Sequence, residues 1–173
     1  KISQLVTPNE VVGLFRIPIL QLPEYKGLIV VLDTIQDPGN LGTIIRLCDW
    51  FGVSQLVCSP ETVDCYNPKV VQATMGSLTR VDIFYTDLNN FMENSNLPVY
   101  LTLLEGDNVY ESDLPNDAIL VMGNEANGIS KSLIQKGYKA LHIPRFGQMQ
   151  QTESLNVAMA TSIFLSEFKR RIF

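Results

Sequence analysis

Two short runs of unbroken apolar residues constrain the fold of this chain more than any other feature. The first covers residues 28–32 (Leu-Ile-Val-Val-Leu), and the second covers residues 118–122 (Ala-Ile-Leu-Val-Met). A strand that is apolar at every position is buried on both faces, which is typical of a parallel sheet covered by helices on both sides. The two runs are therefore predicted to be buried strands of such a sheet.

The rest of the chain alternates between strand-like and helix-like patterns. We expect further strands at 54–58, 81–85, 99–104 and 140–143, and residues 10–16 could form an edge strand. We expect helices at 41–51, 68–75, 88–94 and 130–136, and a long helix that closes the chain. This alternation predicts an α/β domain with a mostly parallel sheet flanked by helices. Ligands of such sheets bind beyond the carboxyl ends of the strands, where three loops have an unusual composition: 34–43, 123–129 and 144–156.

The closing helix is apolar on nearly every side, because its apolar residues cover more than one face. A helix of this kind must be buried, either in the core or against a second subunit. Its polar entrance contains Ser154, which is an N-cap residue by default, and Asn156, whose amide needs a partner beside so many apolar side chains. This entrance is where we expect a site.

Composition and charge limit the class of protein. The 173 residues suffice for one domain, and no apolar run is long enough to span a membrane. The formal net charge of −5 argues weakly against nucleic acid as a ligand, although an uneven distribution of charge would permit it. The cysteines lack metal-binding spacing and are interpreted as free thiols in a reducing compartment. The carboxylates form no metal-type cluster, so we expect no metal.

Each loop offers polar residues with a structural and a functional interpretation. Asn40 is placed to cap the helix that follows it. Arg46 could reach back about one turn toward the loop, or it could be a solvated surface residue. Glu125 could accept hydrogen bonds from a ribose or hold an arginine, or it could belong to a turn. The single histidine, His142, has no partners at triad spacing, which argues against a serine or cysteine hydrolase.

In order and separation, three segments resemble the motifs of the SpoU/TrmH branch of the SPOUT RNA methyltransferases. They are 37–46 (DPGNLGTIIR), 120–130 (LVMGNEANGIS) and 143–158, which contains IP and then ESLNVA. The resemblance covers about residues 8–170. It implies a parallel sheet whose C-terminal part forms a deep trefoil knot, and a homodimer that packs through the knot. It also implies S-adenosylmethionine as cofactor and methyl transfer to a ribose 2′-hydroxyl of RNA.

The resemblance also implies roles for individual residues. Arg46 would be the catalytic arginine, and the catalytic set would be completed by Asn40, Glu125, Ser154 and Asn156. The cofactor would lie against a second group, consisting of Leu103, Leu104, Gly123, Asn124, Gly128, Ile143 and Leu155. Because an arginine stays protonated, we expect Arg46 to hold a phosphate or the 2′-oxygen rather than to act as a base. The loop from Arg145 to Glu153 is longer than is usual in the family.

The resemblance suggests how the chain is organised and where it acts. Residues 1–18 are expected to be a linker or edge segment that follows a missing N-terminal RNA-binding domain, and residues 19–173 are expected to be the catalytic domain. We expect a cytoplasmic enzyme and favour ribosomal RNA over tRNA as its substrate. A catalytically silent SPOUT-like module that binds RNA or a partner is the alternative. An unrelated dinucleotide-binding protein is disfavoured, because no GxGxxG motif follows the first buried strand.

Overall fold

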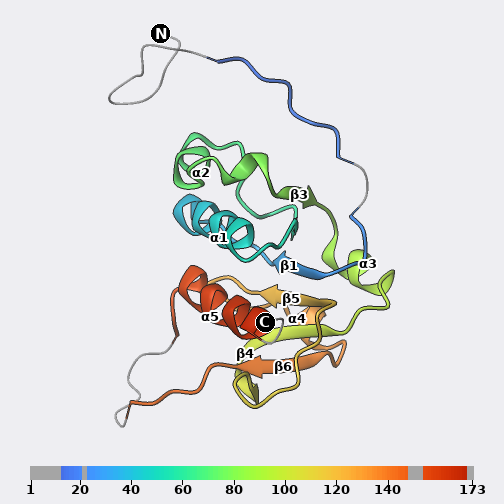
Figure 1. Ribbon diagram of the computed structural model, residues 1–173. Coiled ribbons are helices and arrows are strands. Elements are labelled where there is room, and N and C mark those ends of the chain that lie inside the picture. The colour runs from blue at the N-terminus through green and yellow to red at the C-terminus, as the bar shows by residue number, and fades with distance from the viewer. Residues whose placement is uncertain (1–12, 21–22, 148–153, 171–173) are drawn as a thin grey trace.

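The computed structural model describes residues 13–20, 23–147 and 154–170, which form a parallel sheet between two layers of helices (Figure 1). The strands are β1 (Leu28–Leu32), β2 (Gln55–Cys58), β3 (Asp82–Tyr85), β4 (Val99–Asn108), β5 (Ala118–Met122) and β6 (Lys139–His142). The helices are α1 (Pro38–Trp50), α2 (Pro68–Ala73), α3 (Leu88–Glu93), α4 (Lys131–Ile134) and α5 (Val157–Arg170), with a short 3-10 helix η1 (Ser77–Thr79). The predicted α/β class is therefore confirmed.

The order of the strands is β3-β2-β1-β5-β4-β6, and all the pairs are parallel. The two apolar runs, β1 and β5, are neighbours in the middle of the sheet, with Val30 opposite Leu120, and every residue in both is buried. The chain moves outward from β1 through β2 to β3, whereas β5, β4 and β6 lie on the other side of β1. The direction of winding changes between β1 and β5, which is where such sheets bind ligands.

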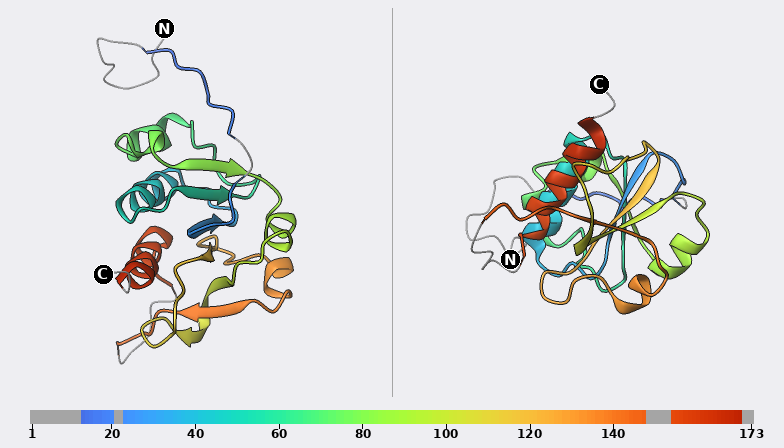
Figure 2. Two further views of the ribbon diagram at one scale, coloured as in Figure 1. Left: turned by 45° about the vertical axis from the view of Figure 1, so that its right-hand side comes forward. Right: turned by 90° about the horizontal axis from the view of Figure 1, so that it is seen from below.

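Alternate residues of β1 face two separate hydrophobic cores. Val30 belongs to the core formed with α1 and α5, whereas Ile29 and Val31 belong to the core formed with α3 and α4. Both views in Figure 2 show helices on either side of the sheet, with α1 and α5 together on one side. This double coverage explains why neither face of the central strands carries a polar residue.

Strand β4 is longer than the predicted 99–104 because the chain leaves the sheet and rejoins it. Thr102 and Asp107 both pair with Leu141 of β6, so the residues between them form a bulge. Gly106 permits the return, because its φ is +152° and a Cβ there would lie 2.6 Å from the carbonyl oxygen of Ala140. The bulge places residues 103–106 at the carboxyl ends of the strands, and bulges are common beside functional sites.

One expectation about the ends of the chain needs correction, and another is met only in part within the single chain. Residues 13–20 form no strand, and the remainder of the suggested edge strand, residues 10–12, lies outside the described residues. Helix α5 is not buried all round in the single chain. Phe164, Leu165 and Phe168 are in the core, but Met159 is 62% exposed, because α5 rests on the sheet and α1 with one side only.

Gly42 allows α1 and α2 to approach each other closely. A Cβ at this position would lie 2.4 Å from the Cβ of Ala73 and 3.0 Å from the carbonyl oxygen of Val70. Gly42 is buried in this contact. Its lack of a side chain is therefore a packing requirement rather than a source of flexibility.

We predict that Gly42→Ala destabilises the fold by about 1–3 kcal/mol, because the added methyl group overpacks the contact between α1 and α2. Urea denaturation followed by circular dichroism measures the free energy of unfolding. Thr43→Ala is the matched control, since Thr43 is the next residue on α1 and is exposed; its effect should stay within about 0.5 kcal/mol. Equal stability of the two variants would contradict the close packing of the helices.

Candidate functional site

Three polar side chains from distant parts of the sequence meet where the strands end. Asn156 Nδ2 donates a hydrogen bond to Asn40 Oδ1 at 3.0 Å, and Asn40 Nδ2 donates to Glu125 Oε1. Asn40 lies in the first turn of α1, Glu125 in the loop after β5, and Asn156 directly before α5. We call these three residues the Asn40 network. It lies at the β1–β5 boundary, and it joins the three loops that the sequence singled out.

Asn40 is available for this network because another residue caps α1. The helix begins at Pro38 rather than at residue 41, and Asp37 Oδ1 accepts a hydrogen bond from the backbone N–H of Asn40 at 2.8 Å. The interpretation of Asn40 as the N-cap was therefore wrong. The proline at the first helical position places the cap on the residue before it, which leaves the Asn40 amide free.

Asn156, and not Ser154, caps α5. Its Oδ1 accepts hydrogen bonds from the backbone N–H groups of Ala158 at 3.0 Å and Met159 at 3.3 Å. The default assignment of the cap to Ser154 was wrong, because the helix begins at Val157 and a cap must directly precede the first helical residue. Ser154 is exposed beside the network.

The hydrogen bonds of the network run in one direction. Asn156 Oδ1 already accepts from the helix, so its Nδ2 is the group that donates to Asn40. Asn40 accepts with Oδ1 and donates with Nδ2, because a carboxylate such as Glu125 can only accept. Glu125 is exposed, and it is held through one oxygen. The network therefore presents an oriented carboxylate at the carboxyl ends of the strands.

The loop that carries Glu125 is tied to the end of β1. Asn124 Nδ2 donates to the carbonyl oxygen of Thr34 at 2.7 Å, and Asn124 Oδ1 accepts from the N–H groups of Ala126 and Asn127. Gly123 is required there, because a Cβ would lie 2.4 Å from the carbonyl carbon of Gly128. Asn124, which was predicted to bind the cofactor, therefore holds this loop in place through its side chain.

Asp33 is a site residue that the sequence reasoning missed. It is buried at the end of β1, and its Oδ2 accepts a hydrogen bond from the backbone N–H of Ser130 at 2.7 Å. This bond fastens the far end of the loop after β5 to the neighbouring strand. Its position in the sequence could have identified it, because a carboxylate directly after a fully apolar strand needs a hydrogen-bond partner.

The residues predicted to bind the cofactor follow three neighbouring strands. Leu103 and Leu104 lie in the bulge of β4, Gly123 follows β5, and Ile143 follows β6. Leu104 is 66% exposed and Leu155 is 50% exposed, so apolar surface is open to a ligand at this end of the sheet. Residues 148–153, which include Glu153 and most of the longer loop, lie outside the described residues.

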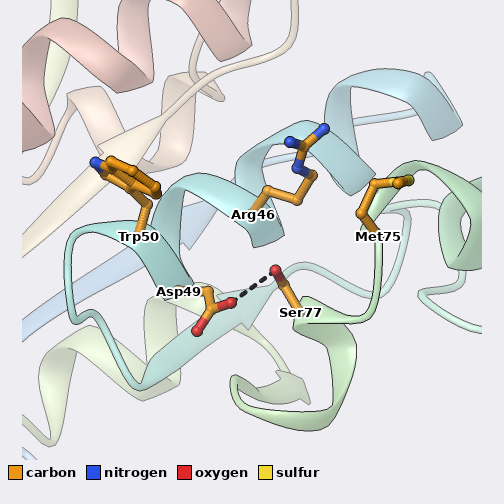
Figure 3. A pocket seen from close by; sticks show the side chains of 5 residues that line it. All are labelled: Arg46, Asp49, Trp50, Met75 and Ser77. Atoms are coloured by element: carbon orange, nitrogen blue, oxygen red, sulfur yellow. Dashed lines mark hydrogen bonds between the residues drawn. The ribbon is translucent and has the colours of Figure 1, made fainter.

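Arg46 does not join the Asn40 network. It lies six residues after Asn40 on α1, which turns it about 240° around the helix. Its exposed side chain instead lines a cavity of about 420 Å³, shown in Figure 3, together with Asp49, Trp50, Met75 and Ser77. We call this the Arg46 cavity. Within the part of the chain that the structure describes, Arg46 forms no hydrogen bond and no ion pair.

The described residues lack both a metal-type cluster and a membrane-spanning helix. No group of three or more His, Cys, Asp or Glu residues there could hold a metal ion, and the absence of a metal stays a prediction. Cys48, Cys58 and Cys65 are free and buried. Burial raises the pKa of the Cys48 thiol to about 12, so this thiol stays protonated. No helix in residues 13–20, 23–147 and 154–170 is long and apolar enough to cross a membrane.

A parallel α/β sheet with polar loops at its switch point defines a broad class of ligand-binding domains. Comparison with known proteins narrows this class, because the profile of the SpoU rRNA Methylase family matches residues 27–166. The chain therefore belongs to this family. A curated relative, 23S rRNA (guanosine(2553)-2′-O)-methyltransferase RlmP of Bacillus subtilis, is 29% identical over 168 residues, which are 95% of this chain and 66% of RlmP.

Two solved structures resemble the fold closely. A TrmH-family protein from Porphyromonas gingivalis is 42% identical, with a TM-score of 0.81 over 89% of this chain and 63% of that protein. An rRNA methyltransferase from Sinorhizobium meliloti, crystallised with AdoMet bound, is 34% identical, with a TM-score of 0.79 over 87% of this chain and 59% of that protein. This chain thus spans less than two thirds of the length of these relatives.

We predict that Asn124→Ala loosens the loop after β5, because it removes three hydrogen bonds that involve the Asn124 side chain. Hydrogen exchange of the amides of Ala126 and Asn127 should become about fivefold faster, since each bond contributes about 1 kcal/mol. Asn127→Ala is the control, because the Asn127 side chain is exposed in the same loop. Unchanged exchange in Asn124→Ala would show that the backbone alone holds the loop.

Proposed function

We propose that this chain is the catalytic domain of an S-adenosylmethionine-dependent RNA 2′-O-ribose methyltransferase, with ribosomal RNA favoured over tRNA. The observation that carries the proposal is the Asn40 network, which brings the three loops of family motifs together where parallel sheets bind ligands. Two of the related proteins are named as rRNA methyltransferases, which supports the choice of RNA.

The open end of the sheet is the proposed binding place of the cofactor. S-adenosylmethionine supplies a methyl group on a positively charged sulfur. Its adenine ring packs against apolar side chains, and its ribose hydroxyls and its amino and carboxylate groups need hydrogen-bond partners. Leu104 and Leu155 offer exposed apolar surface, and Gly123 brings backbone close to the site. These residues, together with Leu103, Asn124, Gly128 and Ile143, are proposed to hold the cofactor.

The roles that we propose for the site residues in methyl transfer follow from the charges of their side chains. Glu125, oriented by Asn40, accepts a hydrogen bond from the ribose and aligns its 2′-hydroxyl. Arg46 stays protonated and stabilises the negative charge that develops on the 2′-oxygen. The 2′-oxygen forms a bond to the methyl carbon as the carbon–sulfur bond breaks, and the hydroxyl proton leaves to a phosphate oxygen or to water. Ser154 is proposed to complete the set beside Asn156.

A homodimer is part of the proposal, because Arg46 and the Asn40 network are separated within one chain. Trp50 on α1 is 84% exposed, and Met159 and Leu155 leave further apolar surface uncovered at and near α5. Exposed apolar surface of this kind is typical of protein interfaces. In a symmetric dimer through α1 and α5, Arg46 of one subunit would approach the network of the other. A trefoil knot and action in the cytoplasm are proposed on the basis of the family resemblance.

We predict that the purified chain binds S-adenosylmethionine in calorimetric titration and methylates ribose 2′-oxygens of ribosomal RNA, as detected by mass spectrometry of digested RNA. Arg46→Ala should lower kcat by about 10²–10³-fold, because it removes a donor to the developing oxyanion, while affinity for the cofactor is retained. Thr43→Ala, on the same exposed side of α1, is the control.

Two outcomes would revise the proposal. A folded dimer that binds the cofactor but methylates neither ribosomal RNA nor tRNA would favour the silent RNA-binding module. If Arg46→Lys were active with a pH–rate profile that follows a lysine amine, residue 46 could act as a general base, contrary to the proposed role of a permanently charged arginine.

We predict that two inactive variants restore activity when their subunits are exchanged. A mixture of Arg46→Ala and Glu125→Ala chains forms mixed dimers in which one of the two composite sites is intact. About a quarter of the wild-type activity should return after refolding of an equimolar mixture, since about half of the dimers are mixed. Failure to recover activity, with dimers verified by light scattering, would mean that each site lies within one subunit.

A further inference from the structure

Arg46 has a carboxylate neighbour on its own helix that does not pair with it. Asp49 lies three residues further along α1, and residues at this spacing are neighbours on a helix surface. In Figure 3 the Asp49 carboxylate points toward Ser77, and the Arg46 guanidinium points away from it. An arginine and an aspartate that line the same cavity would ordinarily attract each other, so the separation needs a cause.

A second arginine, Arg80, keeps Asp49 apart from Arg46. Arg80, which follows η1, donates from Nε and Nη2 to Asp49 Oδ2 at 3.0 Å and 2.7 Å, and Ser77 Oγ donates to the same oxygen at 2.7 Å. The hydrogen bonds from Arg80 and then from Ser77 hold the pKa of Asp49 below its usual value. Asp49 therefore stays ionised and is held against η1 by a two-point contact with a planar guanidinium.

The contact between Arg80 and Asp49 changes the net charge at the Arg46 cavity. Arg46 and Asp49 alone would have no net charge, and RNA would then meet an arginine already neutralised by its neighbour. With Asp49 held by Arg80, the group has one net positive charge, and the Arg46 guanidinium has no partner within residues 13–20, 23–147 and 154–170. In a chain with 13 Lys and Arg residues and 18 Asp and Glu residues, such local placement decides whether a phosphate is attracted.

We propose that Arg80 is a positioning residue for the methyl transfer, which withdraws Asp49 from Arg46 and so keeps Arg46 free to bind RNA. This inference rests on the proposed function of Arg46. Arg80 acts through Asp49 and needs no contact with substrate or cofactor. The competing explanation is a purely structural one, in which the Arg80–Asp49 pair does no more than fasten η1 to α1.

The test uses the dimeric chain and three variants: Arg80→Ala, Asp49→Asn and the double variant. Arg80→Ala should raise the KM for RNA by about three- to tenfold at low salt, because Asp49 then repels phosphate and pairs with Arg46. The increase should shrink as the ionic strength rises, and the affinity for S-adenosylmethionine should not change. Asp49→Asn should lower the KM, since it removes a negative charge from the cavity.

The double variant separates the two explanations. If Arg80 acts through Asp49, then Asp49→Asn in the Arg80→Ala background returns the KM to within about twofold of wild type, because the carboxylate is gone. If the pair only fastens η1 to α1, Asp49→Asn alone weakens activity as Arg80→Ala does, and the double variant shows no recovery. That second result, or an unchanged KM in Arg80→Ala, would overturn the inference.

A direct measurement does not depend on activity. In the side-chain NMR spectrum of Arg80→Ala, the Arg46 guanidinium should show slowed rotation and slowed exchange of its Nε proton, as expected for a new pair with Asp49. Adding Asp49→Asn should abolish both changes. If Arg46 stays unchanged in Arg80→Ala, the inference fails whether or not the chain is a methyltransferase. If the pair appears but Arg46→Ala keeps full activity, the proposed function of Arg46 fails instead.

Discussion

The hydrogen bond between Asn40 and Glu125 is the interaction on which the candidate site depends. It joins α1 to the loop after β5, and Asn156 extends the connection to α5, so three segments far apart in sequence converge on one carboxylate. The bond requires that β1 and β5 be neighbours, since Asn40 and Glu125 follow these two strands. Asp37 caps α1, which leaves Asn40 Oδ1 available to accept the hydrogen bond from Asn156.

The sequence predicts the strands and the location of the site, because both depend on local patterns. An unbroken apolar run such as β1 needs no distant partner to be recognised, and the loops that follow such runs are found by counting along the chain. The N-cap roles given to Asn40 and Ser154 were wrong, because the N-cap is set by the residue at which the helix begins. A shift of two or three residues, as at Pro38, moves the cap to a different side chain.

Other features lay beyond sequence reasoning because they arise from contacts between distant segments. The bulge of β4 depends on the approach of Gly106 to Ala140, more than thirty residues away, and no pattern within β4 signals it. The packing role of Gly42 likewise depends on the placement of α2 against α1. For a similar reason the sequence left open whether α5 is buried in the core or against a second subunit. An apolar helix indicates that a surface must be covered, but not whether the same chain covers it.

The net charge of the chain is a poor guide to the charge at one site. A net charge of −5 argued against RNA, but the total counts every carboxylate equally, including those that are already engaged. Asp49 is engaged by Arg80 and Ser77, so much of its negative charge beside Arg46 is offset by Arg80. A phosphate responds to the charge within about one Debye length, on the order of 10 Å, and not to the sum over the chain. The net charge of an acidic protein therefore does not exclude a local site that attracts phosphate, where a carboxylate is paired and a neighbouring arginine is not.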